Sequence, residues 1–263
     1  MSGPLISAQL TPKQEIDAYA SITVPIAGSN YNVSITKYRC ANTAFGKDPQ
    51  HGGTQDAVKF KDKLLGASGG AVLKSMSATD FVGVFMGKGA RADIVTVLQW
   101  CDQYGLLDKK LDKQKALQQI CDDNIGLDCN GFVGNWANDA GVKTLTPTTP
   151  PATMGQSFIK NRRSALEEIQ PYDIFYWNEH VAAVDSIGPV EGTPKSPRRR
   201  AIICEAYGAI MCQERIILPG SRPGYFQVAA HPWAEAQACS INLVAPAVAA
   251  ALNVLTAVGV FAK

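Results

Sequence analysis

One cysteine stands where a nucleophile would be chemically activated. Cys129 directly precedes a run in which apolar residues recur at helical spacing: Phe132, Val133, Trp136, Ala137 and Ala140. The spacing predicts a helix that begins at Cys129, where the helix dipole and the unpaired backbone N–H groups favour negative charge. This position lowers the pKa of a thiol, and the same N–H groups can stabilise an oxyanion beside the sulfur. Cys129 is therefore a candidate nucleophile, and Gly131 would allow close approach of the backbone.

A nucleophilic thiol needs a base, and the sequence offers His180. This histidine begins a strand-like run, and the small Ala182 on the same face leaves room beside the imidazole. A third polar group fixes the tautomer of the histidine in known triads. Glu205, on the next strand-like run, is the first candidate for this role, and Asp185 and Asn178 are weaker ones. A lone cysteine or histidine is more often structural, so the prediction depends on their combination and order.

The elements that would position these residues follow in a simple order along the chain. Before Cys129, the sequence predicts strands over 22–26 and 31–35 and helices over 56–66, 77–86, 90–104 and 113–122. After it, the sequence predicts a proline-rich linker at 146–151, a helix over 156–169, and strands over 172–177, 180–187, 201–207 and 226–228. The proline-rich residues 188–200 are expected to form a loop between two of these strands. The order of elements predicts an α+β fold with an antiparallel meander.

Composition is that of a globular protein and argues against several functional classes. The chain has 263 residues, of which 46% are hydrophobic and 18% charged, and its net charge of +2 is not that of a nucleic-acid-binding protein. The basic cluster of Lys195, Arg198, Arg199 and Arg200 is interpreted as part of a solvated loop. The seven cysteines have no regular spacing, so we expect most of them to be buried small hydrophobic residues rather than a disulfide framework. No pair has metal-ligand spacing, so neither a metal nor another cofactor is expected.

The two ends of the chain differ in character. The first residues have no basic segment followed by an apolar one, so no Sec-type signal is predicted. Residues 238–262 carry no charge and are rich in alanine, valine and leucine. A segment of this length could span a bilayer. Asn242, Pro246 and Asn253 interrupt this stretch. We therefore favour a buried or partner-covered C-terminal helix over contact with a membrane.

The motifs around Cys129 and His180 resemble those of the NlpC/P60 family of papain-like cysteine peptidases and amidases. The segment Leu127-Asp128-Cys129-Asn130-Gly131-Phe132-Val133 is similar to the family's Asp-Cys-Ser-Gly-Phe/Leu-Val motif, with asparagine in place of serine. Residues 171–177 resemble its Pro-Gly-Asp-Leu strand, and His180-Val181-Ala182-Ala183-Val184 resembles its His-Val-Gly-Ile strand. Residues 163–167 are also typical, and Glu205 falls where the family has a polar third residue. The resemblance covers roughly residues 125–208.

The resemblance implies a fold and an activity. The fold would be a papain-like core at 125–235, with the nucleophile helix packed on an antiparallel sheet. Residues 1–124 would form a mixed, partly helical N-terminal extension, and residues 236–263 an apolar C-terminal segment. The implied activity is that of a cysteine peptidase or amidase with Cys129, His180 and Glu205 as catalytic residues. Family substrates are mostly peptidoglycan stem peptides, so a cell-wall hydrolase is expected.

Several alternatives stay open at this level. A wall hydrolase without a Sec-type signal needs another route, such as injection into the periplasm of a target bacterium as an antibacterial effector, which would have an immunity protein as partner. A phage lysin is a second route. The same fold also includes deamidases and acyltransferases that act on proteins or lipids, although permuted lipid-active relatives place the histidine before the cysteine. A non-catalytic binding module is the third class.

Overall fold

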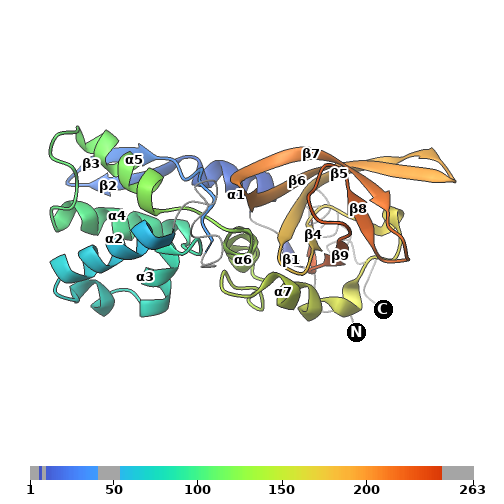
Figure 1. Ribbon diagram of the computed structural model, residues 1–263, viewed down its shortest axis with the longest axis horizontal. Helices are drawn as coiled ribbons and strands as arrows, with labels where there is room; N and C mark the ends of the chain where they lie inside the picture. Colours follow the sequence, from blue (N-terminus) through green and yellow to red (C-terminus); the bar gives the residue numbers. More distant parts are fainter. Residues whose placement is uncertain (1–5, 8–9, 41–53, 245–263) are drawn as a thin grey trace, which may run out of the picture. The chain divides into compact units, whose positions relative to one another are not determined.

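The structure is a computed structural model, and it describes residues 6–7, 10–40 and 54–244 (Figure 1). Helices and a curled antiparallel sheet combine in an α+β fold, as the order of elements predicted. The chain divides into two compact units that alternate along the sequence. The helical unit comprises residues 16–135 and 206–211, and the sheet unit comprises residues 1–15, 136–205 and 212–263.

The main elements of the helical unit are a β-hairpin and a group of helices. These are β2 (Ile22–Ile26), β3 (Ser29–Val33), α2 (Thr54–Ala67), α3 (Ala78–Phe85), α4 (Arg91–Gln103), α5 (Lys113–Asn124) and the first residues of α6 (Cys129–Asp139). Ala27 and Gly28 connect the two strands with φ values of 48° and 80°, the left-handed conformation that tight hairpin turns require. Ser77 begins α3 as predicted, because its hydroxyl accepts a hydrogen bond from the Asp80 backbone N–H at 3.1 Å. Local signals therefore determine most of this unit.

The sheet unit is built on a six-stranded sheet in the order β8-β7-β6-β5-β4-β9. Its strands are β4 (Asp173–Tyr176), β5 (Val181–Thr193), β6 (Ser196–Tyr207), β7 (Ala209–Pro219), β8 (Phe226–Val228) and β9 (Gln237–Ser240). The short strands β1 (Ile6–Ser7) and β10 (Leu243–Val244) pair separately, in parallel. Buried apolar side chains line the sheet, and Phe175 packs edge-on against Phe226 with ring centroids 6.2 Å apart. The predicted strands at 172–177, 180–187, 201–207 and 226–228 are confirmed.

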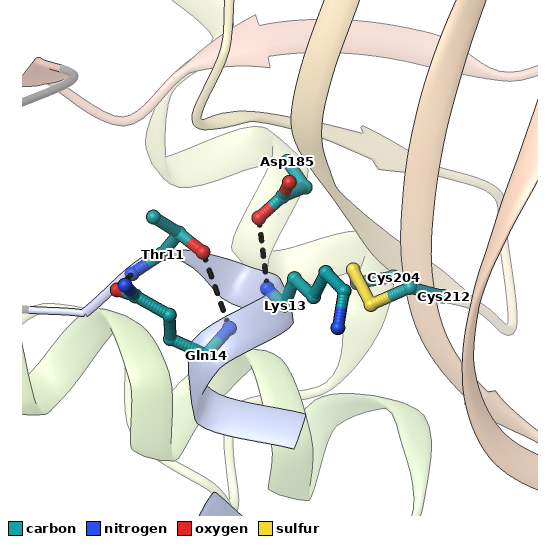
Figure 2. The surroundings of a disulfide bond; sticks show 6 residues. All are labelled: Thr11, Lys13, Gln14, Asp185, Cys204 and Cys212. Atoms are coloured by element: carbon teal, nitrogen blue, oxygen red, sulfur yellow. Dashed lines mark hydrogen bonds between the residues drawn. A yellow bond between two sulfur atoms is a disulfide. The ribbon is translucent and has the colours of Figure 1, made fainter. Parts of the chain in front are cut away.

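Helix α1 (Pro12–Tyr19) begins with a capping box (Figure 2). The Thr11 hydroxyl accepts a hydrogen bond from Gln14 N at 3.1 Å, and the Gln14 side chain accepts one from Thr11 N at 2.9 Å. Pro12 occupies the first helical position, where its missing N–H costs nothing. The next backbone N–H, that of Lys13, donates to the Asp185 carboxylate of β5 at 2.9 Å. Asp185, a weaker candidate for the third catalytic residue, therefore holds the start of α1.

The predicted helix over 156–169 is wrong. Helix α7 runs from Pro151 to Ser157 instead, followed by single 3-10 turns at 159–161 and 166–168. Pro151 starts the helix early because its fixed φ suits the first helical turn. The Glu168 carboxylate accepts hydrogen bonds from the Ser164 backbone N–H at 2.6 Å and from its hydroxyl, which stabilises a turn where the prediction placed continuous helix.

The interpretation of residues 188–200 as a solvated loop is also wrong. Strand β5 continues to Thr193 and β6 starts at Ser196, and the two strands extend together as a ribbon (Figure 1). Arg198 and Arg200 each lie 3.6 Å from the Glu191 carboxylate on the neighbouring strand. Arg199 points to the opposite face, where it is buried and donates to four backbone carbonyls: those of Leu166, Glu167, Ile169 and Gly188. The three arginines of the basic cluster are therefore part of the sheet, and Lys195 lies in the turn between β5 and β6.

The apolar C-terminal segment is not helical where it is described. Residues 237–240 form β9 and residues 243–244 form β10, because this stretch pairs with β4 and β1. The remainder of the expected helix, residues 245–263, lies outside the described residues. Within the part of the chain that the structure describes, no helix is long and apolar enough to cross a bilayer.

Candidate functional site

Helix α6 begins at Cys129, as the sequence predicted. The Asp128 carbonyl accepts the first helical hydrogen bond, from Phe132 N at 2.9 Å, and its carboxylate accepts one from Gly131 N at 2.7 Å. Asp128 is therefore the N-cap of the helix. Cys129 is buried, with 5% of its surface exposed, and it lies outside the disulfide of the chain. The thiol thus occupies the first helical position, where the helix dipole favours a thiolate.

The backbone of residues 87–89 packs closely against this helix start. The Gly87 carbonyl accepts a hydrogen bond from Asp128 N at 3.0 Å. A Cβ built on Gly131 would overlap the Gly87 carbonyl oxygen and would lie 2.9 Å from its carbonyl carbon, so only glycine fits at position 131. The Lys88 ammonium donates to the Asp128 carboxylate and to the Asn130 side-chain oxygen. The predicted close approach at Gly131 is confirmed, and its partner is Gly87.

Two titratable groups near Cys129 have shifted pKa values. Burial raises the pKa of the Asp128 carboxyl to about 6, although the Lys88 ammonium and the Gly131 N–H lower it. Burial also raises the pKa of Tyr38, and the negative forms of Cys129, Cys40 and Asp128 raise it further. The Tyr38 hydroxyl therefore stays protonated, and the Tyr38 side chain forms a hydrogen bond with Cys40. The sequence reasoning missed Tyr38, which lies about ninety positions before the cysteine.

The structure brings His180 and Glu205 together inside the sheet unit. His180 directly precedes β5, and its carbonyl accepts a hydrogen bond from Trp177 N at 2.8 Å. Its Nε2 lies 2.7 Å from Glu205 Oε2, and both side chains are buried, with 1% and 3% exposed. Asn178 is exposed in the preceding turn. Of the three candidates for the third residue, Glu205 is the one that contacts the histidine.

A second histidine and an arginine also bind Glu205. The His231 Nε2 lies 3.0 Å from the same carboxylate oxygen, Oε2, and Arg215 Nη2 lies 3.4 Å from Oε1. Tryptophan rings flank both imidazoles. Trp177 stacks on His231 with centroids 4.3 Å apart, and Trp233 stacks on His180 at 4.5 Å. His231 was missed because it follows a loop without periodicity; its only signal was that it is one of three histidines.

The electrostatics of this cluster define its protonation state. Burial raises the pKa of Glu205, but hydrogen bonds from His180 and His231 outweigh burial and hold the pKa well below its usual range. Burial lowers the pKa of His180 below 6.5, and the Glu205 carboxylate opposes this shift only in part. A neutral His180 therefore donates its Nε2–H to an ionised Glu205. In this tautomer Nδ1 is the basic nitrogen, which is the atom that would accept a proton from a nucleophile.

The same three side chains are the group that could hold a metal ion among the described residues. One ligand atom from each of His180, Glu205 and His231 lies within 4.8 Å of the other two, and such ligands suit zinc or iron. When both imidazoles carry their proton on Nε2, these two N–H groups and the Arg215 guanidinium satisfy the carboxylate. We therefore assign the cluster as hydrogen-bonded.

An open depression of about 850 Å³ adjoins this cluster in the sheet unit, with His231 and Trp233 in its wall. Arg222 and Tyr225 also line it, and the guanidinium lies flat on the phenol ring, 3.7 Å from its centroid. Arg222 is exposed. The depression therefore offers aromatic surface and both a positive and a negative side chain, Arg222 and Glu235, and its Trp233 stacks on His180.

A disulfide joins β6 and β7 one residue before Glu205. Cys204 and Cys212 are bonded, close to Lys13 of α1 (Figure 2). The expectation of buried cysteines outside disulfides holds for Cys101, Cys121, Cys129 and Cys239 but is wrong for this pair. Their separation of eight residues is no signal by itself. The bond forms because the chain reverses at Gly208, where φ is 68°, and so places the two cysteines on adjacent strands.

The candidate residues belong to two different units. Cys129 lies in the helical unit, whereas His180 and Glu205 lie in the sheet unit. The pairing of Cys129 with His180 stays a prediction. A comparison with family models, curated proteins and solved structures gives no match to this chain.

Proposed function

We propose that this chain is a cysteine peptidase or amidase with Cys129 as nucleophile and His180 as general base, on a papain-like core of the NlpC/P60 type. The observation that supports the proposal best is the buried His180–Glu205 hydrogen bond of 2.7 Å. It holds a neutral imidazole with Nε2–H toward the carboxylate and leaves Nδ1 as the basic atom. The position of Cys129 at the start of α6 supports the other half of the proposal.

The chemistry follows from these roles. His180 Nδ1 takes the proton of the Cys129 thiol, and the thiolate attacks the amide carbonyl carbon of the substrate. Backbone N–H groups at the start of α6 stabilise the oxyanion. The C–N bond then breaks as His180 returns the proton to the leaving amine. Water activated by the same imidazole hydrolyses the thioester and releases the thiol. Glu205 stabilises the imidazolium at each stage.

We propose peptidoglycan stem peptides as the substrate, on the resemblance of the motifs around Cys129 and His180. The depression beside His231 is large enough for part of a peptide, and its Arg222 guanidinium suits a carboxylate. A hydrolase of this kind would act in the periplasm of a target bacterium, with an immunity protein as partner.

The test is digestion of purified peptidoglycan, with released amino groups and peptides identified by mass spectrometry. The parent protein is expected to release peptides, and Cys129→Ala is expected to release none. Cys101→Ala is the matched control, since Cys101 is a buried cysteine of α4 whose pKa burial raises to about 12. Equal cleavage by the parent and by Cys129→Ala would refute the proposal.

A second experiment tests the place of action. Expression of the parent protein with a periplasmic leader is expected to lyse the cells, whereas cytoplasmic expression and a periplasmic Cys129→Ala variant are expected to be harmless. Equal toxicity in the cytoplasm would contradict a substrate in the cell wall.

A further inference from the structure

We propose that His231 is a positioning residue, whose Nε2–H holds the Glu205 carboxylate so that the other hydrogen bond of Oε2 goes to His180. This inference rests on the proposed function, in which His180 is the base. The geometry points to it because one carboxylate oxygen accepts from both imidazoles, at 2.7 Å from His180 and 3.0 Å from His231.

A glutamate needs such support more than a shorter acid does. Its side chain has three rotatable bonds, and a carboxylate that samples several rotamers would orient an imidazole poorly. In this cluster the two oxygens are held separately. Oε2 accepts from the two histidines, and Oε1 accepts from Arg215 at 3.4 Å. The carboxylate is also 97% buried, so water does not replace a lost donor easily.

His231 is itself held in place by its surroundings. Trp177 stacks on its ring with an interplanar angle of 9°, and only 1% of the side chain is exposed. The loop that carries it turns at Ala230, where φ is 60°, a conformation that alanine rarely adopts. Backbone hydrogen bonds anchor the loop on both sides, from Ala229 N to Ile216 O at 2.8 Å and from His231 N to Val228 O at 3.1 Å. A strained residue immediately before a buried histidine indicates a loop shaped to deliver that side chain.

Three roles for His231 can be separated by its tautomer and its packing. A positioning residue must carry its proton on Nε2, because a carboxylate only accepts. A metal ligand would carry none there. A residue that only packs against Trp177 needs its ring but no proton at that nitrogen.

The first experiment uses the unmodified full-length protein. Histidine side chains labelled with ¹⁵N are observed by long-range ¹H–¹⁵N correlation at neutral pH, with assignments from His180→Gln and His231→Gln. We expect Nε2 to carry a proton in both residues. An unprotonated Nε2 on His231 would overturn the proposal, whatever the activity of the protein.

The second experiment compares two replacements of His231. His231→Phe keeps the ring but removes the donor, and His231→Gln loses the ring but places an N–H near the former Nε2. Loss of a hydrogen bond to a buried charge is expected to lower kcat on peptidoglycan peptides about tenfold to a hundredfold in the Phe variant, with KM nearly unchanged. The Gln variant is expected to retain most of kcat. Retention by Phe and loss by Gln would mean that packing matters rather than the hydrogen bond, and the proposal would fail.

The third experiment separates this proposal from the proposed function. In a Cys129→Ala background no hydrolysis is required, and the titration of His180 is followed by NMR. The charged and titratable groups that act on its pKa include Glu205 and His231, and Arg215 contacts the same carboxylate. His231→Phe removes the donor that holds Glu205 and is expected to shift the pKa of His180, whereas His231→Gln keeps a donor and is expected to leave the pKa of His180 unchanged. An unchanged titration in the Phe variant would refute the role of His231, while an inactive parent with the expected titration would refute only the hydrolase.

Discussion

Gly131→Ala is expected to damage the start of the Cys129 helix. Alanine is the better helix former, so propensity alone would favour this substitution by up to about 1 kcal/mol. The structure predicts the opposite outcome. The new methyl group would overlap the Gly87 carbonyl oxygen and would lie 2.8 Å from Asp128 Oδ1 and 2.9 Å from the Gly87 carbonyl carbon. Real Cβ atoms essentially never approach other heavy atoms this closely, so the backbone of one segment must move.

The magnitude follows from what that movement breaks. Overpacking of a buried site costs about 1–3 kcal/mol. Separation of residues 87 and 131 also strains the hydrogen bond from Asp128 N to Gly87 O, worth about 1 kcal/mol, and the N-cap bond from Gly131 N to Asp128, worth about as much again. After subtraction of the gain in propensity, we expect a net loss of about 2–4 kcal/mol. That loss corresponds to a Tm lower by about 4–16 °C for a unit of this size.

The assay compares thermal and urea unfolding of the parent with two alanine variants. Gly66→Ala is the matched control, because Gly66 also lies in a helix, α2, and a Cβ at that position would meet no atom within 4 Å. The control is expected to be neutral or to gain up to about 1 kcal/mol. In addition, the rate of Cys129 alkylation by iodoacetamide is expected to change in Gly131→Ala and to stay unchanged in the control.

The reasoning would be refuted if Gly131→Ala unfolded at the same temperature as Gly66→Ala. Such a result would mean that Gly87 and the start of α6 are not in close contact in solution. A loss of stability without any change in Cys129 alkylation would preserve the packing argument but would contradict a role for this contact in shaping the surroundings of the thiol.

Four further predictions concern charge, cross-linking and metals. The pKa of Glu205 is lowered in the folded state, so the ionised carboxylate stabilises the fold above the usual glutamate pKa range, and this stabilisation is lost as pH falls. Urea unfolding between pH 7 and pH 3 should show the decrease in the free energy of unfolding, and Glu205→Gln should make that decrease smaller. Asp128 affects the pH dependence of stability in the opposite direction, because its pKa is about 6 in the folded state and 3.8 as a reference. The free energy of unfolding should therefore fall by up to about 3 kcal/mol as pH rises between these values, and Asp128→Asn should remove that dependence. The Cys204–Cys212 disulfide closes a loop with a separation of eight residues, and its reduction is expected to lower the free energy of unfolding by about 2.5 kcal/mol. Urea unfolding with and without dithiothreitol measures this difference, and the Cys204→Ser/Cys212→Ser variant should show no effect of dithiothreitol. Treatment with EDTA is expected to leave the melting temperature unchanged, because hydrogen bonds satisfy the Glu205 carboxylate; a large decrease would show that a metal binds there.

Local signals were sufficient where neighbours in the sequence determine the structure. The cap at Ser77, the hairpin turn at Ala27-Gly28 and the start of α6 at Cys129 each depend on contacts within about four residues. Glu205 could also be predicted as the partner of His180, because a meander places consecutive strands side by side. In the structure, β5 and β6 are neighbours with Ala183 opposite Cys204.

Two predictions that were based on prolines are wrong. Pro189 and Pro197 made residues 188–200 resemble a loop, yet both lie in strands. A shift in register between Ile187 and Val190 marks an irregularity at which the first proline is tolerated. Pro151, taken as the end of an extended linker, instead begins α7. A proline removes one N–H donor, and only the position of that donor in the folded chain decides whether the loss matters.

The sequence by itself determined the type of each candidate residue and the element that carries it: a thiol at a helix start, an imidazole at a strand start and a carboxylate on the next strand. Only the tertiary structure decided what surrounds them. Three contacts join residues whose spacing along the chain has no helical or strand period: His231 with Glu205, Gly87 with Gly131, and Cys204 with Cys212. Such contacts depend on how loops return to the sheet or to a helix end, and the geometry of these returns is set by packing over the whole unit rather than by local propensity.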